Sequence, residues 1–438
     1  MKKIFIPLMT VVVVVSIIFA GCVPAVEPAP PVTPPPVTPP VTPPVVEPPV
    51  TPPVTPPVAP PVVEPPAWLV PPLVVPVYPE EVIANWIAKG YGDDYYLAAE
   101  LVTGAENIAF CTVISAPAEP IVVHKRFRIA VIAPSLDLSD AWYSGWKALE
   151  GRLEELGIPA IVNFMGTGGA DHEKMAGFID AAIAAEYDYI IVAPTELKVM
   201  KEHLEAIMDA GIPLIVWNNT TAFRDWGTER RPEGGQPLAW INFDHGNMGL
   251  IVGMKILEYL PENANIVLLR GVPGVVDWNR SDIPKTLFEL AGHNVIYEHV
   301  CDWSHDPAYE GTLAAFAAHH PDPGIDHVYC ASSGISFGAV AALKELGLAG
   351  EILVNGQGGG PAEFGHMFDG NLYCTAFRMQ DDWGVALAEV IKYHIMDRMD
   401  EVPLVIIPPT MIADMTMTPA DIAGYTAYAY RYSGVLEY

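Results

Sequence analysis

The strongest constraint on the fold is a pattern of short apolar runs alternating with amphipathic stretches, which begins near residue 127 and restarts after residue 243. Such alternation is typical of parallel strands whose two faces are covered by helices. Because the pattern occurs twice, the sequence predicts an α/β fold with two similar parallel-sheet lobes joined by crossover segments. The expected strands are residues 128–133, 160–164, 189–193, 213–217 and 239–243, and then 265–269, 295–300, 327–330, 351–354 and 372–377.

The last part of the chain is expected to serve both lobes, because a helix at residues 382–399 and an apolar stretch at 402–412 follow the last strand of the pattern. An extension at residues 80–126, with one expected helix over residues 79–88, precedes the pattern and is expected to pack on it. The predicted lobes are residues 127–244 with part of 378–438, and residues 245–377 with part of 378–438.

The amino terminus, residues 1–22, has the layout of an export signal. Lys2 and Lys3 precede an apolar run over residues 4–20, which ends in Phe-Ala-Gly-Cys at residues 19–22. Small residues before a cysteine resemble a bacterial lipoprotein cleavage box, which would make Cys22 the lipidated first residue. The alternative is a retained transmembrane anchor, since about 20 apolar residues span a bilayer. Either interpretation places the body outside the cytoplasmic membrane and tethered to its outer face.

A proline-rich stretch follows at residues 23–79. It holds 25 of the 45 prolines of the chain, many of them in Val-Thr-Pro-Pro repeats. Such a composition favours polyproline II and cannot build a core, so this segment is predicted to be a disordered stalk.

Composition excludes one class of partner. The formal net charge is −29, the opposite sign to that of a nucleic-acid binder, so no nucleic acid is expected. Four further cysteines, Cys111, Cys301, Cys330 and Cys374, show no CxxC spacing and are interpreted as small core residues.

The loops after the predicted strands are the expected binding region, because ligands of parallel sheets bind beyond the carboxyl ends of the strands. These loops are rich in Trp, Asn, Asp, Ser and Arg. Planar hydrogen-bonding groups suit neighbouring hydroxyls, and a Trp face suits an apolar ring face. The composition therefore favours a sugar or a sugar-like ligand.

At these loops the sequence resembles the type I periplasmic binding protein superfamily, and within it the autoinducer-2 receptors of the LuxP type. The resemblance runs from about residue 127 to residue 434. It is carried by Ser139-Asp140-Ala141-Trp142, by Asn218 with Thr220-Thr221 and Arg224-Asp225-Trp226, by Phe243-Asp244-His245, by Asn355-Gly356-Gln357-Gly358-Gly359-Gly360, by Arg378-Met379-Gln380-Asp381-Asp382 and by Arg431-Tyr432-Ser433.

The resemblance implies a set of ligand-binding residues between the lobes. Ser139, Trp142, Asn218, Arg280 and Arg378 match the ligand contacts of the LuxP type, whereas Asp137, Ser333 and Gln357 stand at ligand positions but differ from it. A carboxylate at Asp137 about 4 Å from an anionic borate ester would cost ~4 kcal/mol at an effective dielectric near 20. A neutral or weakly anionic sugar is therefore the expected ligand.

Other kinds of site have weaker support. The glycine-rich segment 356–360 lacks the context of a dinucleotide-binding turn, HExxH and CxxC metal motifs are absent from the sequence, and no GxSxG elbow surrounds Ser139 or Ser333. The expectation is a binding protein without enzymatic activity, cofactor or metal. Its lobes would close on a sugar-like molecule and deliver it to the permease of an ABC importer; the alternative is a LuxP-like receptor that signals to a membrane sensor kinase.

Overall fold

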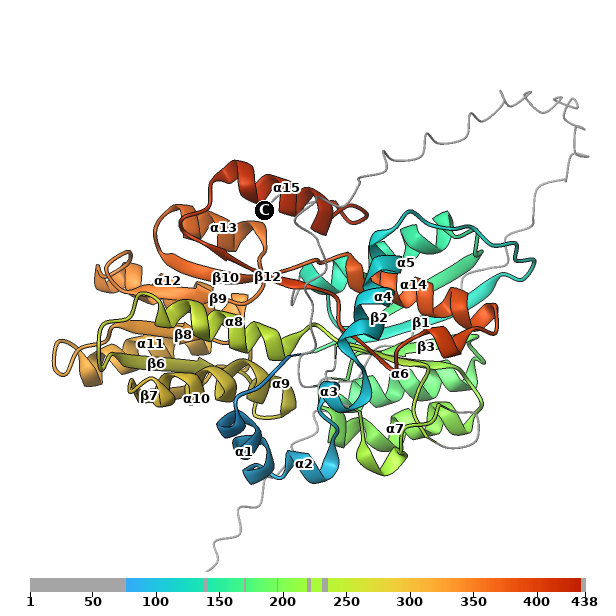
Figure 1. Ribbon diagram of the computed structural model, residues 1–438, viewed down its shortest axis with the longest axis horizontal. Helices are drawn as coiled ribbons and strands as arrows, with labels where there is room; N and C mark the ends of the chain where they lie inside the picture. Colours follow the sequence, from blue (N-terminus) through green and yellow to red (C-terminus); the bar gives the residue numbers. More distant parts are fainter. Residues whose placement is uncertain are drawn as a thin grey trace, which may run out of the picture. The chain divides into compact units, whose positions relative to one another are not determined.

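The computed structural model describes residues 76–136, 140–168, 171–194, 196–218, 222–230 and 235–434. Two six-stranded sheets form the body, one from each half of the repeated pattern (Figure 1). The predicted α/β fold with two parallel-sheet lobes is confirmed. The predicted signal, Cys22 and nearly all of the stalk lie outside the described residues, and within the described residues no helix is long and apolar enough to cross a membrane.

The first sheet has the strand order β11-β5-β4-β3-β1-β2, and all its neighbouring strands pair in parallel. Its elements are β1 (Phe127–Pro134), α5 (Asp140–Glu155), β2 (Ala160–Thr167), α6 (His172–Ala184), β3 (Tyr189–Val192), α7 (Leu197–Asp209), β4 (Leu214–Trp217), the 3-10 turn η1 (Arg224–Trp226), β5 (Ala239–Ile241) and, from the end of the chain, α14 (Asp382–Ile395), η3 (Met399–Glu401) and β11 (Val405–Ile406).

The second sheet has the order β12-β10-β9-β8-β6-β7, with β12 antiparallel to β10. Its elements are α8 (His245–Leu257), β6 (Asn265–Arg270), α9 (Val275–Asp277), the π-helical turn η2 (Trp278–Asp282), α10 (Ile283–Leu290), β7 (Asn294–Val300), α11 (His305–His319), β8 (His327–Cys330), α12 (Ser333–Leu346), β9 (Leu353–Gly356), α13 (Pro361–Phe368), β10 (Leu372–Arg378), β12 (Thr410–Asp414) and α15 (Pro419–Ala429).

Each sheet is covered by helices on both faces. Since successive side chains of a strand point to opposite sides, apolar residues are needed at every position along it. In β1, Ile129 and Val131 pack against α5 and α14, whereas Ala130 and Ile132 pack against α6 and α7. The second sheet repeats this arrangement, with α11, α12 and α13 on one face and α8 and α10 on the other. This two-sided burial explains why the strands read as continuous apolar runs.

Three segments connect the lobes: β5 to α8, β10 to α14, and β11 to β12. The predicted apolar stretch 402–412 thus supplies one strand to each sheet. The first segment touches the start of α14, because the rings of Phe243 and Trp383 stack. Asp244, buried in the first segment, has φ +54° and lies at the start of α8.

The amino-terminal extension is more helical than predicted. It contains α1 (Glu80–Ala88), α2 (Tyr91–Asp94), α3 (Ala98–Leu101) and α4 (Gly104–Ser115), of which only α1 was expected. Residues 76–79, assigned to the stalk from the sequence, lead into α1, with Pro76 buried and Tyr78 packed against Trp278.

The cysteines behave as core residues. Cys111, Cys301, Cys330 and Cys374 are all buried and free, as the absence of a disulfide pattern indicated. Burial raises the pKa of Cys301, to about 12, and that of Cys330.

His327 makes the stability of lobe 2 sensitive to acid. It is fully buried, its Nδ1 lies against the Tyr259 hydroxyl, and burial lowers its pKa from 6.5 to about 4. Below pH 6.5 His327 is protonated in the unfolded chain but stays neutral in the folded chain. The free energy of unfolding therefore falls as pH drops from 6.5 towards 4. We expect His327→Gln to flatten this part of the pH dependence of the unfolding free energy, as measured by urea titration; an unchanged slope would contradict it.

Candidate functional site

A cavity of about 820 Å³ lies at the carboxyl ends of the strands, between the loops of the two sheets. It is lined by six residues that the sequence singled out, two from lobe 1 and four from lobe 2. These are Trp142, Asn218, Arg280, Ser333, Gln357 and Arg378. The other predicted ligand contacts, Asp137 and Ser139, lie outside the described residues.

Arg280 reaches the cavity from the π-helical turn η2. This turn approaches α8 so closely that a Cβ at Gly249 would lie 1.9 Å from the carbonyl oxygen of Asn279. Burial, and then the charge of Arg378, lowers the pKa of Arg280 to about 9. The guanidinium lies over the ring of Trp303, with Cζ 5.7 Å from its centroid, so it is held between an aromatic face and the cavity.

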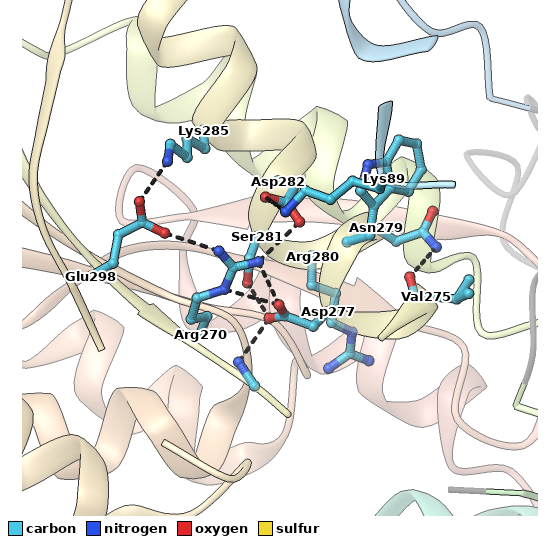
Figure 2. A network of polar contacts seen from close by, with 12 residues as sticks. Lys89, Arg270, Val275, Asp277, Asn279, Arg280, Ser281, Asp282, Lys285 and Glu298 are labelled. Atoms are coloured by element: carbon cyan, nitrogen blue, oxygen red, sulfur yellow. Dashed lines mark hydrogen bonds and ion pairs between the residues drawn. The ribbon is translucent and has the colours of Figure 1, made fainter. Parts of the chain in front are cut away.

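A network of ion pairs and hydrogen bonds around Arg270 holds the turn η2 in place (Figure 2). Arg270 binds Asp277 at 2.6 Å, Asp282 at 2.9 Å and Glu298 at 2.9 Å. Asp277 also accepts hydrogen bonds from the hydroxyl of Ser281 and the backbone NH of Gly271. The side chain of Arg280 extends from the same turn without joining the network, so the turn is fixed while Arg280 is left for the cavity.

His245 connects Arg280 to the other lobe. The Nε of Arg280 donates to His245 Nδ1 at 2.9 Å, and His245 Nε2 lies 3.1 Å from Oδ1 of Asn218. Because an arginine can only donate, Nδ1 must accept, so the ring proton sits on Nε2 and points to Asn218. Burial, followed by the positive charges of Arg280 and Arg378, holds the pKa of His245 well below its usual range, which keeps the ring neutral.

Arg378 ends β10 and enters the cavity beside the second connection between the lobes. It is 6% exposed, and its Cζ lies 5.0 Å from the ring centroid of Trp383 and 5.3 Å from that of Phe243. Its Nε donates to the carbonyl oxygen of Gly358 at 3.4 Å. Two buried guanidinium groups therefore share one cavity.

Gln357 and Ser333 line the wall opposite Trp142. The side-chain NH2 of Gln357 donates to the backbone oxygens of Arg280 at 3.2 Å and Cys330 at 3.3 Å, so Gln357 supports the Arg280 turn. Ser333 begins α12 so close to Gly358 that a Cβ there would lie 2.0 Å from the Ser333 hydroxyl oxygen. A larger residue at 358 would displace the Ser333 hydroxyl, which gives a reason for glycine at this position.

Trp142 belongs to both the core and the cavity wall. It is 7% exposed and packs edge-on against Trp217, with ring centroids 5.1 Å apart. Both interpretations of this residue, core packing and ligand contact, are thus compatible with its position.

Among the lining residues that were not predicted as ligand contacts are His245, Trp303 and Glu363. His245 stands in a segment that carried the resemblance, and Trp303 stands in a loop after a predicted strand, so each had a signal. Glu363 is fully buried, and one of its oxygens accepts from the Thr375 hydroxyl at 2.7 Å. Its other oxygen has no hydrogen-bond partner among the described residues.

The arrangement suits binding better than nucleophilic catalysis. The cavity offers two guanidinium groups, amides, a carboxylate and aromatic faces, which are groups that satisfy hydroxyls and cover a ring. Both ring nitrogens of His245 are engaged, by Arg280 and Asn218, so this histidine is not placed to activate Ser333 as a base.

Comparison with known proteins gives the same fold. One solved relative is a galactofuranose binding protein, 18% identical, with a TM-score of 0.58 and coverage of 69% of this chain and 100% of that one. Another is an ABC transporter solute binding protein from Agrobacterium vitis bound with alpha-D-tagatopyranose, 21% identical, with a TM-score of 0.61 and coverage of 68% and 98%. A third is the binding protein of the arabinose ABC transporter from Shewanella sp. ANA-3, bound to arabinofuranose, 18% identical, with a TM-score of 0.59 and coverage of 71% and 99%.

A family model described as a periplasmic binding protein domain matches residues 129–398. This range includes both sheets apart from the last strands, and it contains all six described residues that the sequence placed at the site. Because the match spans more than half of the chain, the protein belongs to the periplasmic binding protein family.

Proposed function

We propose that the protein is an extracytoplasmic solute-binding protein that holds a sugar or sugar-like molecule between its lobes. The observation that carries the proposal is the cavity of about 820 Å³ in which Arg280, Arg378 and Asn218 face aromatic walls. Binding-protein lobes move about their connections, and a ligand favours the closed arrangement by its differential affinity. Binding, not turnover, is the proposed activity.

Solved relatives support the sugar class. Their bound ligands include arabinofuranose, alpha-D-tagatopyranose and myo-inositol, which share adjacent hydroxyls on a compact ring. Arg280 and Arg378 would donate to such hydroxyls, while Trp142 and Trp303 would cover the ring faces. Asp137 and Ser139 would complete the site from the loop after β1.

Several solved relatives come from ABC transporters, so an ABC permease is the proposed partner.

The proposed location is the outer side of the cytoplasmic membrane, with a lipid at Cys22 as the anchor. Metabolic labelling with a radioactive fatty acid should mark the wild-type chain and spare Cys22→Ala; equal labelling of both would remove the proposed anchor.

A second candidate is the autoinducer-2 receptor of the LuxP type, signalling to a membrane sensor kinase. It is favoured by one observation, the pair of buried arginines in one cavity, because a borate ester carries a negative charge. A carboxylate at Asp137 would oppose that charge, so a plain sugar remains the primary proposal.

A thermal-shift screen of the full chain tests the sugar proposal. The panel is L-arabinose, D-galactose, D-tagatose, D-allose, myo-inositol and autoinducer-2 with and without borate, with L-leucine as the control. A ligand at a hundredfold excess over its dissociation constant should stabilise the protein by ~2.7 kcal/mol, a melting shift of a few degrees. A shift with autoinducer-2 alone would select the second candidate, and a shift with leucine alone would contradict both.

A further inference from the structure

The extension before β1 touches both lobes. Residues 76–116 precede the range matched by the family model, residues 129–398, so this segment is additional to the shared fold. Its first helix, α1, packs on η2 and α10 of lobe 2, and its second, α2, packs on η1 of lobe 1. Figure 1 shows α1 next to α10.

On lobe 2 the contact centres on Trp278, two residues before Arg280 in the same π-helical turn. The rings of Trp86 and Trp278 meet edge-on with centroids 4.6 Å apart, and the indole NH of Trp278 donates to Oδ1 of Asn85 at 2.9 Å. Lys89 pairs with Asp282 at 3.4 Å, and Figure 2 shows it reaching the network that anchors the turn. The end of α1 thus holds the turn that carries Arg280.

On lobe 1 the contact centres on residues 222–224, which follow the Asn218 loop. The backbone NH of Tyr96 donates to the carbonyl oxygen of Ala222 at 2.9 Å. Arg224 donates to the carbonyl oxygen of Gly92 at 2.6 Å and pairs with both carboxylate oxygens of Glu100 at 2.8 and 2.6 Å.

The extension contacts lobe 1 over more of its length than lobe 2, because α2 and α4 pack on lobe 1 and α1 packs on lobe 2. In α4, Asn107 exchanges two hydrogen bonds with the backbone of Ile407, at 2.9 and 2.8 Å, and Phe110 and Ile114 are buried in the core of lobe 1. On lobe 2, α1 buries Val82 and Trp86, and Lys89 is 42% exposed in its ion pair with Asp282. Because the lobe 1 side also has the buried hydrogen bonds of Asn107, α1 is the one expected to release when the two anchors are pulled apart.

The chain between the two anchors has no slack. Only Gly90 and Tyr91 separate Lys89, which contacts lobe 2, from Gly92, which contacts lobe 1. The three residue steps from Lys89 to Gly92 span at most about 11 Å. A hinge motion that moves Trp278 away from Ala222 by more than this short segment can follow must break one of the two contacts.

We propose that residues 76–101 form an interlobe clamp, in which α1 holds the Trp278–Asp282 turn of lobe 2 at a fixed distance from residues 222–224 of lobe 1. The clamp limits motion about the three connections between the lobes, and release of α1 accompanies opening. Since Trp278 and Arg280 share one turn, the clamp also positions Arg280 in the cavity.

The distance between the lobes tests the clamp without any ligand, so the result is separate from the sugar proposal. Spin labels on Glu202→Cys in α7 and Glu289→Cys in α10 report that distance by double electron–electron resonance; both positions are exposed, and Cys111, Cys301, Cys330 and Cys374 are buried. All proteins also carry Cys22→Ser. The variants are Asn85→Ala with Lys89→Ala, and Trp86→Ala.

We expect one narrow distance in the otherwise wild-type protein and a broadened or second distance in both clamp variants. Lys125→Ala is the control, since it removes an ion pair with Asp188 that lies within lobe 1, and it should leave the narrow distance unchanged. If Trp86→Ala fails to fold, as judged by circular dichroism, the Asn85 and Lys89 variant decides. A broad distribution in the wild type, or the wild-type distance in the folded variants, would overturn the clamp.

Discussion

Replacing Arg378 by alanine is expected to weaken sugar binding by roughly 10- to 100-fold while leaving the fold intact. Arg378 lies in the cavity wall, and charge-assisted hydrogen bonds contribute ~1.5 to 3 kcal/mol each. Its removal takes one buried positive charge away from Arg280, whose pKa Arg378 helps to lower, so the unliganded protein should not be strongly destabilised. The measurement is an equilibrium titration of wild type and variant with the sugar that gives the largest thermal shift.

Arg398→Ala is the matched control for Arg378. Arg398 is the same residue type, but its side chain is 43% exposed and pairs with Glu401 outside the cavity lining. Its loss should leave affinity unchanged. Equal affinities for wild type and Arg378→Ala would remove Arg378 from the binding site.

Asp277→Ala is expected to cost about 3 kcal/mol of unfolding free energy, the scale on which a buried ion pair is destabilised by loss of one partner. The carboxylate of Asp277 is 1% exposed and holds Arg270, Ser281 and the backbone of Gly271 together. Because Ser281 adjoins Arg280, sugar affinity should fall as well. Urea unfolding and the same binding titration measure the two effects.

Glu298→Ala is the control for Asp277→Ala, because it also removes an ion pair of Arg270 but one that is not buried. Glu298 binds the same guanidinium at 2.9 Å, but its side chain is 33% exposed. A partly exposed pair contributes at most about 1 kcal/mol, so this variant should lose little stability and keep its affinity. If both variants were equally destabilised, burial of Asp277 would not be the cause.

The fold could be predicted from the sequence because both faces of each sheet are buried. Strands such as β3, with the sequence Tyr-Ile-Ile-Val fully buried, stand out from the amphipathic helices between them. Helix α4 was missed because its apolar residues are not confined to its buried face: Asn107, Phe110, Cys111 and Ile114 share that face, whereas Ile108 and Val113 lie off it and are only partly buried. The one local signal was the capping box from Thr103 to Glu106, which marks the start of the helix.

Part of the cavity lining could also be predicted from the sequence, from the position of residues relative to the strands. Arg280 and Arg378 stand after apolar strands, where parallel sheets gather their ligand contacts, and both line the cavity. The role of His245 was not readable, because its two partners, Asn218 and Arg280, come from different sheets. The contact of Trp86 with Trp278 likewise joins residues far apart in the sequence, and no local pattern encodes it.

Calorimetric titration of the full chain with L-arabinose, D-galactose, D-tagatose and myo-inositol tests the central claim most directly. Sugar binding in the cavity predicts saturable binding of at least one of them at one site per chain, lost or strongly weakened in Arg378→Ala and retained in Arg398→Ala. The absence of saturable binding to every sugar of the panel, or binding that Arg378→Ala leaves unchanged, would contradict it.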